Sequence, residues 1–173
     1  MENLENIQYT QDSRGNEFYM KSKFTILIID DDPNSIKILI DVLQKKYEVM
    51  IATSGQRGLD IARNDPTIDL ILLDIIMPIM DGYDVINHLN LGNKTKDIPV
   101  IFLTSKDGYY DDVIGLNLGA MDYITKPVSK TRLLAKINAH IFKRKNSEQQ
   151  ANHYAERAMD EFYPIGYGEK RKK

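Results

Sequence analysis

The stretch Leu70–Gly82, with the sequence LILLDIIMPIMDG, constrains the fold of this chain more than any other. It opens with four consecutive aliphatic residues, a pattern typical of a strand buried on both faces in a parallel sheet. Asp74 ends this run, and the Met77-Pro78 and Asp81-Gly82 pairs then break regular structure before a helix begins. The pattern therefore predicts a carboxylate held at the end of a rigid strand, where it would act as a nucleophile or a ligand. A turn or helix cap at Asp74 is the alternative that this stretch leaves open.

Strands and helices are predicted to alternate five times along the chain. Short apolar runs predict the strands, and apolar residues at helical spacing predict the helices between them. The strands are expected at Thr25–Ile29, Glu48–Ala52, Asp69–Leu73, Pro99–Leu103 and Asp122–Thr125. The helices are expected from Pro33 to Lys46, after Thr53-Ser54 to Asn64, from Gly82 to Leu91, from Tyr109 to Leu118, and from about Ser129 onward. This order is typical of an α/β fold, a doubly wound parallel sheet with helices on both faces.

Composition excludes several classes of protein. A chain of 173 residues is long enough for one domain with extensions. Its net charge of −2 gives no electrostatic support for direct nucleic-acid binding or for an anionic membrane surface. The absence of cysteine excludes disulfides and is typical of a reducing compartment, so we expect a cytoplasmic protein. No apolar stretch approaches the roughly 18 residues of a membrane span.

Polar residues gather where the predicted strands end. Asp30 and Asp31 follow the first strand, Asp74 the third, Thr104 the fourth and Lys126 the fifth. In open α/β sheets the ligand crevice lies outside these carboxyl ends. If the first and third strands are neighbours, three carboxylates converge there, so either something positive joins them or their pKa values rise. A hard divalent cation takes such oxygen ligands, and Mg²⁺ is the usual choice. Taken singly, each residue is more often a cap, a turn or a solvated side chain, but together they form a site for a phosphoryl group with Asp74 as the candidate acceptor.

This set of motifs resembles the receiver domain of bacterial two-component response regulators. The resemblance covers about Phe24 to Lys145 and is carried by Asp30-Asp31, Asp74 with Met77-Pro78 and Asp81-Gly82, Thr104-Ser105, and Lys126-Pro127. It implies a flavodoxin-like (CheY-like) fold with strand order 2-1-3-4-5. It also implies a receiver in a phosphorelay that takes a phosphoryl group from a sensor histidine kinase or a phosphotransfer protein and switches the binding of an unknown downstream protein. No enzyme activity beyond Mg²⁺-dependent self-phosphorylation and slow self-dephosphorylation is implied.

The resemblance assigns a role to each residue of the acceptor site. Asp74 would be the phosphoacceptor, and Asp31 the main Mg²⁺ carboxylate, helped by Asp30, by Asp74 and by the backbone carbonyl of Ile76. Thr104 would donate a hydrogen bond to the phosphoryl oxygens, and Lys126 would pair with them.

Three further positions would control the switch and the lifetime of the phosphoryl group. Tyr123 would turn inward when Thr104 moves toward the phosphate; a half-buried tyrosine packed on the last helix is the structural alternative. Ile76 and Lys106 would flank the route of the hydrolytic water. Neither side chain activates a water, so we expect slow hydrolysis. Side chains that only line a solvated rim are the structural alternative.

Two segments lie outside the region of resemblance. Residues 1–23 have no clear period and are expected to be a flexible extension to the receiver at 24–145. Residues 146–173 are expected to form a helical extension and tail, whose apolar face at Ala151–Phe162 must pack on something to stay ordered. We favour self-association as a homodimer; folding back on the receiver and docking on a separate partner stay open.

Two other functions compete with the receiver. A haloacid-dehalogenase-type phosphatase also forms an aspartyl phosphate, with Asp30 as nucleophile in an Asp-x-Asp motif that Asp32 completes. Against it, Asn34 replaces the expected Thr or Val and no acidic pair follows the fourth strand. A degenerate receiver that only binds is disfavoured because none of the acceptor-site residues is missing. His88, His140 and His153 lack the context of a phosphodonor.

Overall fold

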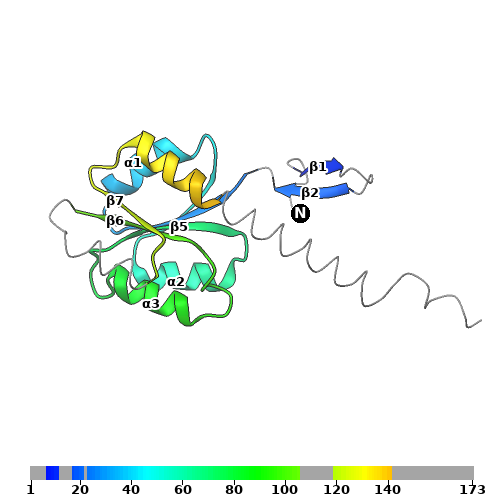
Figure 1. Ribbon diagram of the computed structural model, residues 1–173. Coiled ribbons are helices and arrows are strands. Elements are labelled where there is room, and N and C mark those ends of the chain that lie inside the picture. Colours follow the sequence, from blue (N-terminus) through cyan, green and yellow to red (C-terminus); the bar gives the residue numbers. More distant parts are fainter. Residues whose placement is uncertain (1–6, 12–16, 22, 106–118, 142–173) are drawn as a thin grey trace, which may run out of the picture. The chain divides into compact units, whose positions relative to one another are not determined.

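A five-stranded parallel sheet organises the protein. The computed structural model describes residues 7–11, 17–21, 23–105 and 119–141. The sheet has the order β4-β3-β5-β6-β7 (Figure 1). Its strands are β3 (Thr25–Ile29), β4 (Glu48–Ala52), β5 (Ile68–Asp74), β6 (Val100–Thr104) and β7 (Asp122–Thr125). Counted within the sheet, the order is 2-1-3-4-5, so the predicted fold class is confirmed.

The central strands are those with the longest aliphatic runs. All five residues of β3 are buried, as are the last five of β5, which fits strands covered on both faces. β3 pairs in parallel with β5, and Ile29 lies opposite Leu73. β5 begins one residue earlier than predicted and includes Asp74. This pairing makes the two strands with terminal aspartates neighbours.

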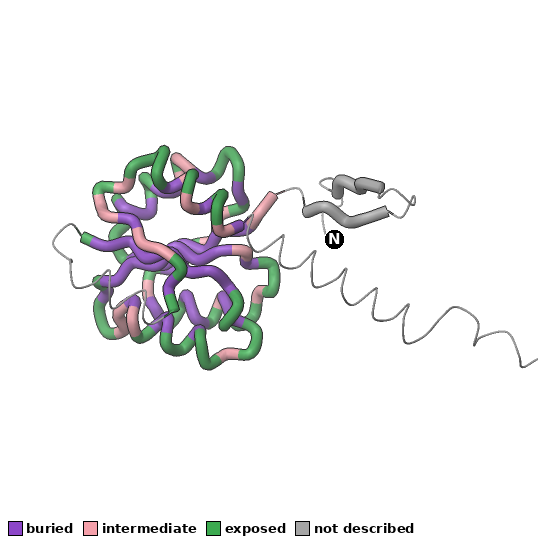
Figure 2. The backbone as a smooth tube through the Cα atoms, viewed as in Figure 1, coloured by how far each residue is buried: buried purple, intermediate pink, exposed green. Residues whose placement is uncertain are grey.

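One helix follows each of the strands β3, β4 and β5, and each of these helices begins at a side-chain cap. They are α1 (Pro33–Leu43), α2 (Gly55–Asn64) and α3 (Gly82–Leu91). Asp32, Ser54 and Asp81 accept hydrogen bonds from the free amides of the first turns. α1 lies on one side of the sheet and α2 and α3 on the other (Figure 1). Buried residues fill the sheet and the inner helix faces (Figure 2).

α1 ends earlier than predicted, whereas α3 ends at Leu91 as predicted but has an unusual glycine cap. α1 stops at Leu43 instead of Lys46, because the amides of Lys46 and Tyr47 both donate to the Leu43 carbonyl in a turn that leads into β4. Gly92 ends α3, but with an ordinary φ of −86° instead of the left-handed value expected for a glycine cap. A Cβ there would lie 2.3 Å from the Thr95 hydroxyl oxygen, so Gly92 serves close approach. That hydroxyl donates to the Leu89 carbonyl at 2.6 Å and so caps the helix.

The N-terminal segment contains regular structure that the sequence analysis missed. β1 (Ile7–Gln11) and β2 (Glu17–Lys21) form a two-stranded antiparallel sheet, so the expectation of an extension without regular elements is wrong for this part. The overlooked signal is a pair of short runs with β-forming Ile, Tyr, Thr and Phe around the turn-forming sequence DSRGN.

The last predicted elements fall only partly on described residues. Residues 130–141 are helical, and Leu133, Ile137 and Ile141 are buried, as the apolar spacing predicted. The helix predicted at Tyr109–Leu118 and the extension at 146–173 lie outside the described residues. Among the helices that the structure describes, none combines the length and the apolar character needed to span a bilayer.

Candidate functional site

Parallel strands bring four of the predicted site residues to one edge of the sheet. Asp30 follows β3, Asp74 is the last residue of β5, Thr104 is the last residue of β6, and Lys126 follows β7. The amide of Lys126 donates to the Thr104 carbonyl at 2.7 Å, which ties these two strand ends together. The site is thus built from strand ends in a rigid, buried sheet.

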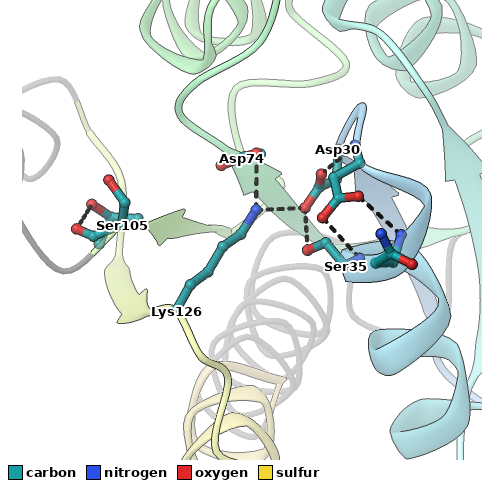
Figure 3. A network of polar contacts seen from close by, with 8 residues as sticks. Asp30, Ser35, Asp74, Ser105 and Lys126 are labelled. Atoms are coloured by element: carbon teal, nitrogen blue, oxygen red, sulfur yellow. Dashed lines mark hydrogen bonds and ion pairs between the residues drawn. The ribbon is translucent and has the colours of Figure 1, made fainter.

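Lys126 joins the two buried carboxylates. Its Nζ donates to Oδ2 of Asp30 and to Oδ2 of Asp74, each at 2.9 Å (Figure 3). The side chain of Asp30 is 0% exposed and that of Asp74 is 9% exposed, whereas Lys126 is 26% exposed. Lys126 is thus shared between two carboxylates that water hardly reaches. Its one positive charge offsets only one of their two negative charges.

The start of α1 holds both oxygens of Asp30. The Ser35 hydroxyl donates to Oδ2 at 2.6 Å, and the Asp32 amide donates to Oδ1 at 2.9 Å. The Asp32 side chain in turn accepts from the amides of Asn34 and Ser35. Ser35 is 9% exposed and had no role in the sequence analysis. A serine one turn beyond an acidic pair gives no signal, because only the fold points its hydroxyl at Asp30.

Burial and charge act in opposite directions on the site. Burial raises the pKa of Asp74 above its ordinary value, and the nearby Asp30 adds to this, while Lys126 and the Ile76 amide offset it only in part. For Lys126, burial alone would lower the pKa, but its bonds to Asp30 and Asp74 outweigh burial and the pKa is raised. The ammonium form of Lys126 is therefore secure, and the ionised form of Asp74 would gain from a second cation.

Three carboxylates fit a hard divalent cation. Asp30, Asp31 and Asp74 each offer an oxygen, and the three atoms lie within 4.8 Å of one another. Asp31 is exposed and the other two are buried, so an ion here would have protein oxygens on one side and water on the other. Oxygen ligands with retained water are the set that Mg²⁺ prefers. The donor set of this site therefore fits the predicted Mg²⁺.

The loop after Asp74 is held close to the start of α3. The amide of Gly82 donates to the Ile75 carbonyl at 2.8 Å. A Cβ on Gly82 would lie 2.5 Å from the carbonyl oxygen of Asp74, so only glycine allows this approach. Ile79, at the tip of the loop, has a φ of 69°, a strained value for a β-branched residue. Ile76 is 64% exposed, so its apolar side chain lies at the surface close to Asp74 in the chain.

The side chains of Thr104 and Tyr123 lie outside the hydrogen bonds that join the Lys126 ammonium to Asp30 and Asp74. Thr104 is buried, and its hydroxyl donates to the Ser105 carbonyl at 3.2 Å instead of to a site residue. Tyr123 is half-buried and packs against the hydrophobic core. Lys106 lies outside the described residues.

The geometry disfavours Asp30 as a nucleophile. It is fully buried, and both of its oxygens accept hydrogen bonds. The Asp32 side chain caps α1. An Asp-x-Asp pair in these positions presents neither carboxylate as a phosphatase requires.

Comparisons with known proteins point in one direction. The family model of the response regulator receiver domain matches residues 26–138. A probable cyclic di-GMP phosphodiesterase of Vibrio cholerae is 42% identical over 127 residues, which are 73% of this chain and 29% of that protein. Protein PilH of Pseudomonas aeruginosa is 41% identical over 115 residues, 66% of this chain and 94% of PilH. The chain spans between 29% and 53% of the length of the first curated relatives.

A solved structure with a metal ion is among the similar folds. It is the receiver domain of the sensor histidine kinase PA1611 from Pseudomonas aeruginosa, with magnesium coordinated in its active-site cleft. The TM-score is 0.64 at 25% identity, over 69% of this chain and 98% of that one. That protein carries its magnesium in a fold equivalent to the one described above.

Proposed function

This chain belongs to the response regulator receiver domain family, and we propose that Asp74 is its phosphoacceptor. A histidine kinase or a phosphotransfer protein would donate the phosphoryl group. The observation that carries this assignment is the junction of Asp74, Lys126 and Asp30 at the end of β5, with both Lys126 contacts at 2.9 Å. Asp74 is the carboxylate on a strand end beside a loop, whereas Asp30 is enclosed by α1. The receiver role is the one that its family and its relatives share.

The reaction follows from the placement of these side chains. An Asp74 carboxylate oxygen attacks the phosphorus, the bond from phosphorus to the donor nitrogen breaks, and that electron pair returns to the donor. Lys126 already contacts Asp74, so its ammonium lies where charge on the transferring phosphoryl group has to be balanced. Asp30 keeps Lys126 in place through its second contact.

Asp30, Asp31 and Asp74 would hold Mg²⁺, as their oxygens within 4.8 Å of one another support. The ion supplies positive charge for the oxygens of the phosphoryl group. The backbone carbonyl of Ile76 stays a predicted further ligand.

The switch would use Thr104 and Tyr123. The Thr104 hydroxyl donates its hydrogen bond to the Ser105 carbonyl at 3.2 Å, a long contact for an O–H donor. A phosphoryl oxygen on Asp74 offers a charged acceptor, and such bonds are roughly twice as strong as neutral ones. Turning of Thr104 toward Asp74 would free space into which the half-buried Tyr123 moves. Ile76 and Lys106 would slow hydrolysis of the acyl phosphate, because neither activates a water.

Domain limits and partners complete the proposal. We place the receiver at 24–145, between an N-terminal extension at 1–23 and a helical extension at 146–173. Dimerisation through 146–173 is tested by sedimentation of the full chain against a version that ends at Lys145. If both versions sediment as monomers at high concentration, with and without a phosphate mimic, dimerisation through this segment is excluded. The output protein would bind the face that the switch remodels.

Intact mass after incubation with acetyl phosphate and Mg²⁺ tests the function. We expect the mass of one phosphoryl group on the wild type, none on Asp74→Asn, and slow uptake on Asp31→Asn. Unchanged uptake by Asp74→Asn would refute the acceptor assignment.

A further inference from the structure

Ser35 closes a ring of hydrogen bonds around the Asp30 carboxylate. Its hydroxyl donates to Asp30 Oδ2 at 2.6 Å, and its amide donates to Asp32 Oδ2 at 3.2 Å. The Asp32 amide completes the ring by donating to Asp30 Oδ1 at 2.9 Å. Ser35 and Asp30 are both buried, and Figure 3 shows the two side chains joined at the start of α1. The ring fixes the carboxylate of Asp30 to the first turn of α1.

The number of lone pairs limits what Asp30 can still bind. A carboxylate offers about four acceptor positions, two on each oxygen. On Oδ2 both are taken, one by Ser35 and one by Lys126 at 2.9 Å. On Oδ1 the Asp32 amide takes one. A single position on Oδ1 is left for a cation, and Asp30 cannot bind one through both oxygens without losing a bond.

Lys126 alone could not impose this orientation. Its long, flexible chain is shared between Asp30 and Asp74, and it would follow either oxygen if the Asp30 carboxylate turned. Ser35 has a short side chain on a capped helix turn, so its hydroxyl has little freedom to follow. The rotation of the carboxylate therefore depends on Ser35 together with the Asp32 amide.

We propose that Ser35 is a positioning residue for the metal site: its hydroxyl closes Oδ2 of Asp30 and restricts Asp30 to binding the ion through Oδ1. The inference rests on the proposed magnesium site and adds a residue that never contacts the ion. Partners of this kind, hydrogen-bonded to a ligand, typically change metal affinity by 10- to 100-fold when they are removed. The expected effect here is at the lower end, because Lys126 and Asp32 still hold Asp30.

The test compares matched variants of the full chain by calorimetric titration with Mg²⁺. Ser35→Thr keeps the hydroxyl, and Ser35→Val has nearly the same shape without it. We expect Ser35→Val and Ser35→Ala to lose about tenfold in Mg²⁺ affinity and Ser35→Thr to stay within about threefold of the wild type. Melting in EDTA measures any purely structural effect of the added methyl group, which the Thr and Val variants share.

Each result decides the proposal. Equal Mg²⁺ affinity of Ser35→Val and Ser35→Thr overturns it, because shape would then account for the whole effect. A wild type that takes up a phosphoryl group on Asp74 while all variants bind Mg²⁺ alike overturns the role of Ser35 and leaves the acceptor assignment standing. A wild type that binds no Mg²⁺ overturns the metal site and this inference together.

Discussion

Replacement of Lys126 by methionine should lower the free energy of unfolding, and the size of this loss should depend on pH and on Mg²⁺. The substitution keeps an unbranched side chain only one atom shorter but removes the charge between Asp30 and Asp74. Removing one partner of a buried ion pair typically costs about 3–5 kcal/mol, because the other charge stays buried alone. Lys126 is 26% exposed and Asp30 keeps two other donors, so the lower end applies, about 3 kcal/mol or on the order of 10 °C in melting temperature.

The pH dependence follows from the raised pKa of Asp74. A carboxyl whose pKa is higher in the folded state binds its proton more tightly there, so the free energy of unfolding falls as pH rises from the unfolded pKa through the folded one. Without Lys126 the pKa of Asp74 rises further, since Lys126 provides the main opposing contribution. The deficit of Lys126→Met should therefore be smaller near pH 5 than near pH 8.

Mg²⁺ should restore much of the lost stability. A ligand that binds only the folded state adds about 2.7 kcal/mol at 100 times its dissociation constant. The measurement is urea and thermal unfolding at both pH values in EDTA and in Mg²⁺. Lys96→Met, at an exposed lysine, is the matched control and should change stability by less than about 0.5 kcal/mol. A Lys126→Met variant as stable as the wild type at pH 8 in EDTA, or equally destabilised at both pH values, would refute the reasoning.

Four further outcomes are expected. Asp74→Asn in EDTA should be more stable than the wild type near pH 7 by thermal unfolding, because the raised pKa of Asp74 means that its environment disfavours the carboxylate; a lower melting temperature would contradict this. Gly82→Ala should cost about 1–3 kcal/mol in urea unfolding, since a Cβ would meet the Asp74 carbonyl at 2.5 Å, and a gain would show that the loop yields freely. Ile76→Asn with Lys106→Glu should speed loss of the phosphoryl group, followed by intact mass over time, and an unchanged decay would sink the lifetime argument. NMR shifts on adding beryllofluoride should cluster at residues 104–126; shifts confined to the loop after Asp74 would count against the switch.

The strand ends could be predicted from the sequence because strands buried on both faces require continuous apolar residues. Continuous aliphatic runs such as the last four residues of Thr25–Ile29 have few alternatives to a buried strand. Parallel strands place their ends at one edge of the sheet, which brought Asp30, Asp74 and Lys126 together as expected. Nothing in this reasoning needed the exact path of the loops. The proposed acceptor site could be predicted for the same reason.

Details that depend on side-chain direction could not be predicted. The Ser35–Asp30 hydrogen bond and the Gly92–Thr95 contact both lie at helix ends. They depend on how the side chains pack there, which the residue types alone do not predict. The Thr104 hydroxyl donates to the Ser105 carbonyl, an acceptor that the identity of residue 104 alone does not predict. The hairpin of β1 and β2 was missed because its runs are short and mix polar with β-forming residues.

The position of the phosphoryl group tests the central claim most directly. After incubation with acetyl phosphate and Mg²⁺, borohydride reduction converts the aspartyl phosphate to homoserine, and peptide mapping by mass spectrometry locates it. The account predicts homoserine at residue 74 alone. Homoserine at residue 30 would contradict it and would support the phosphatase alternative instead.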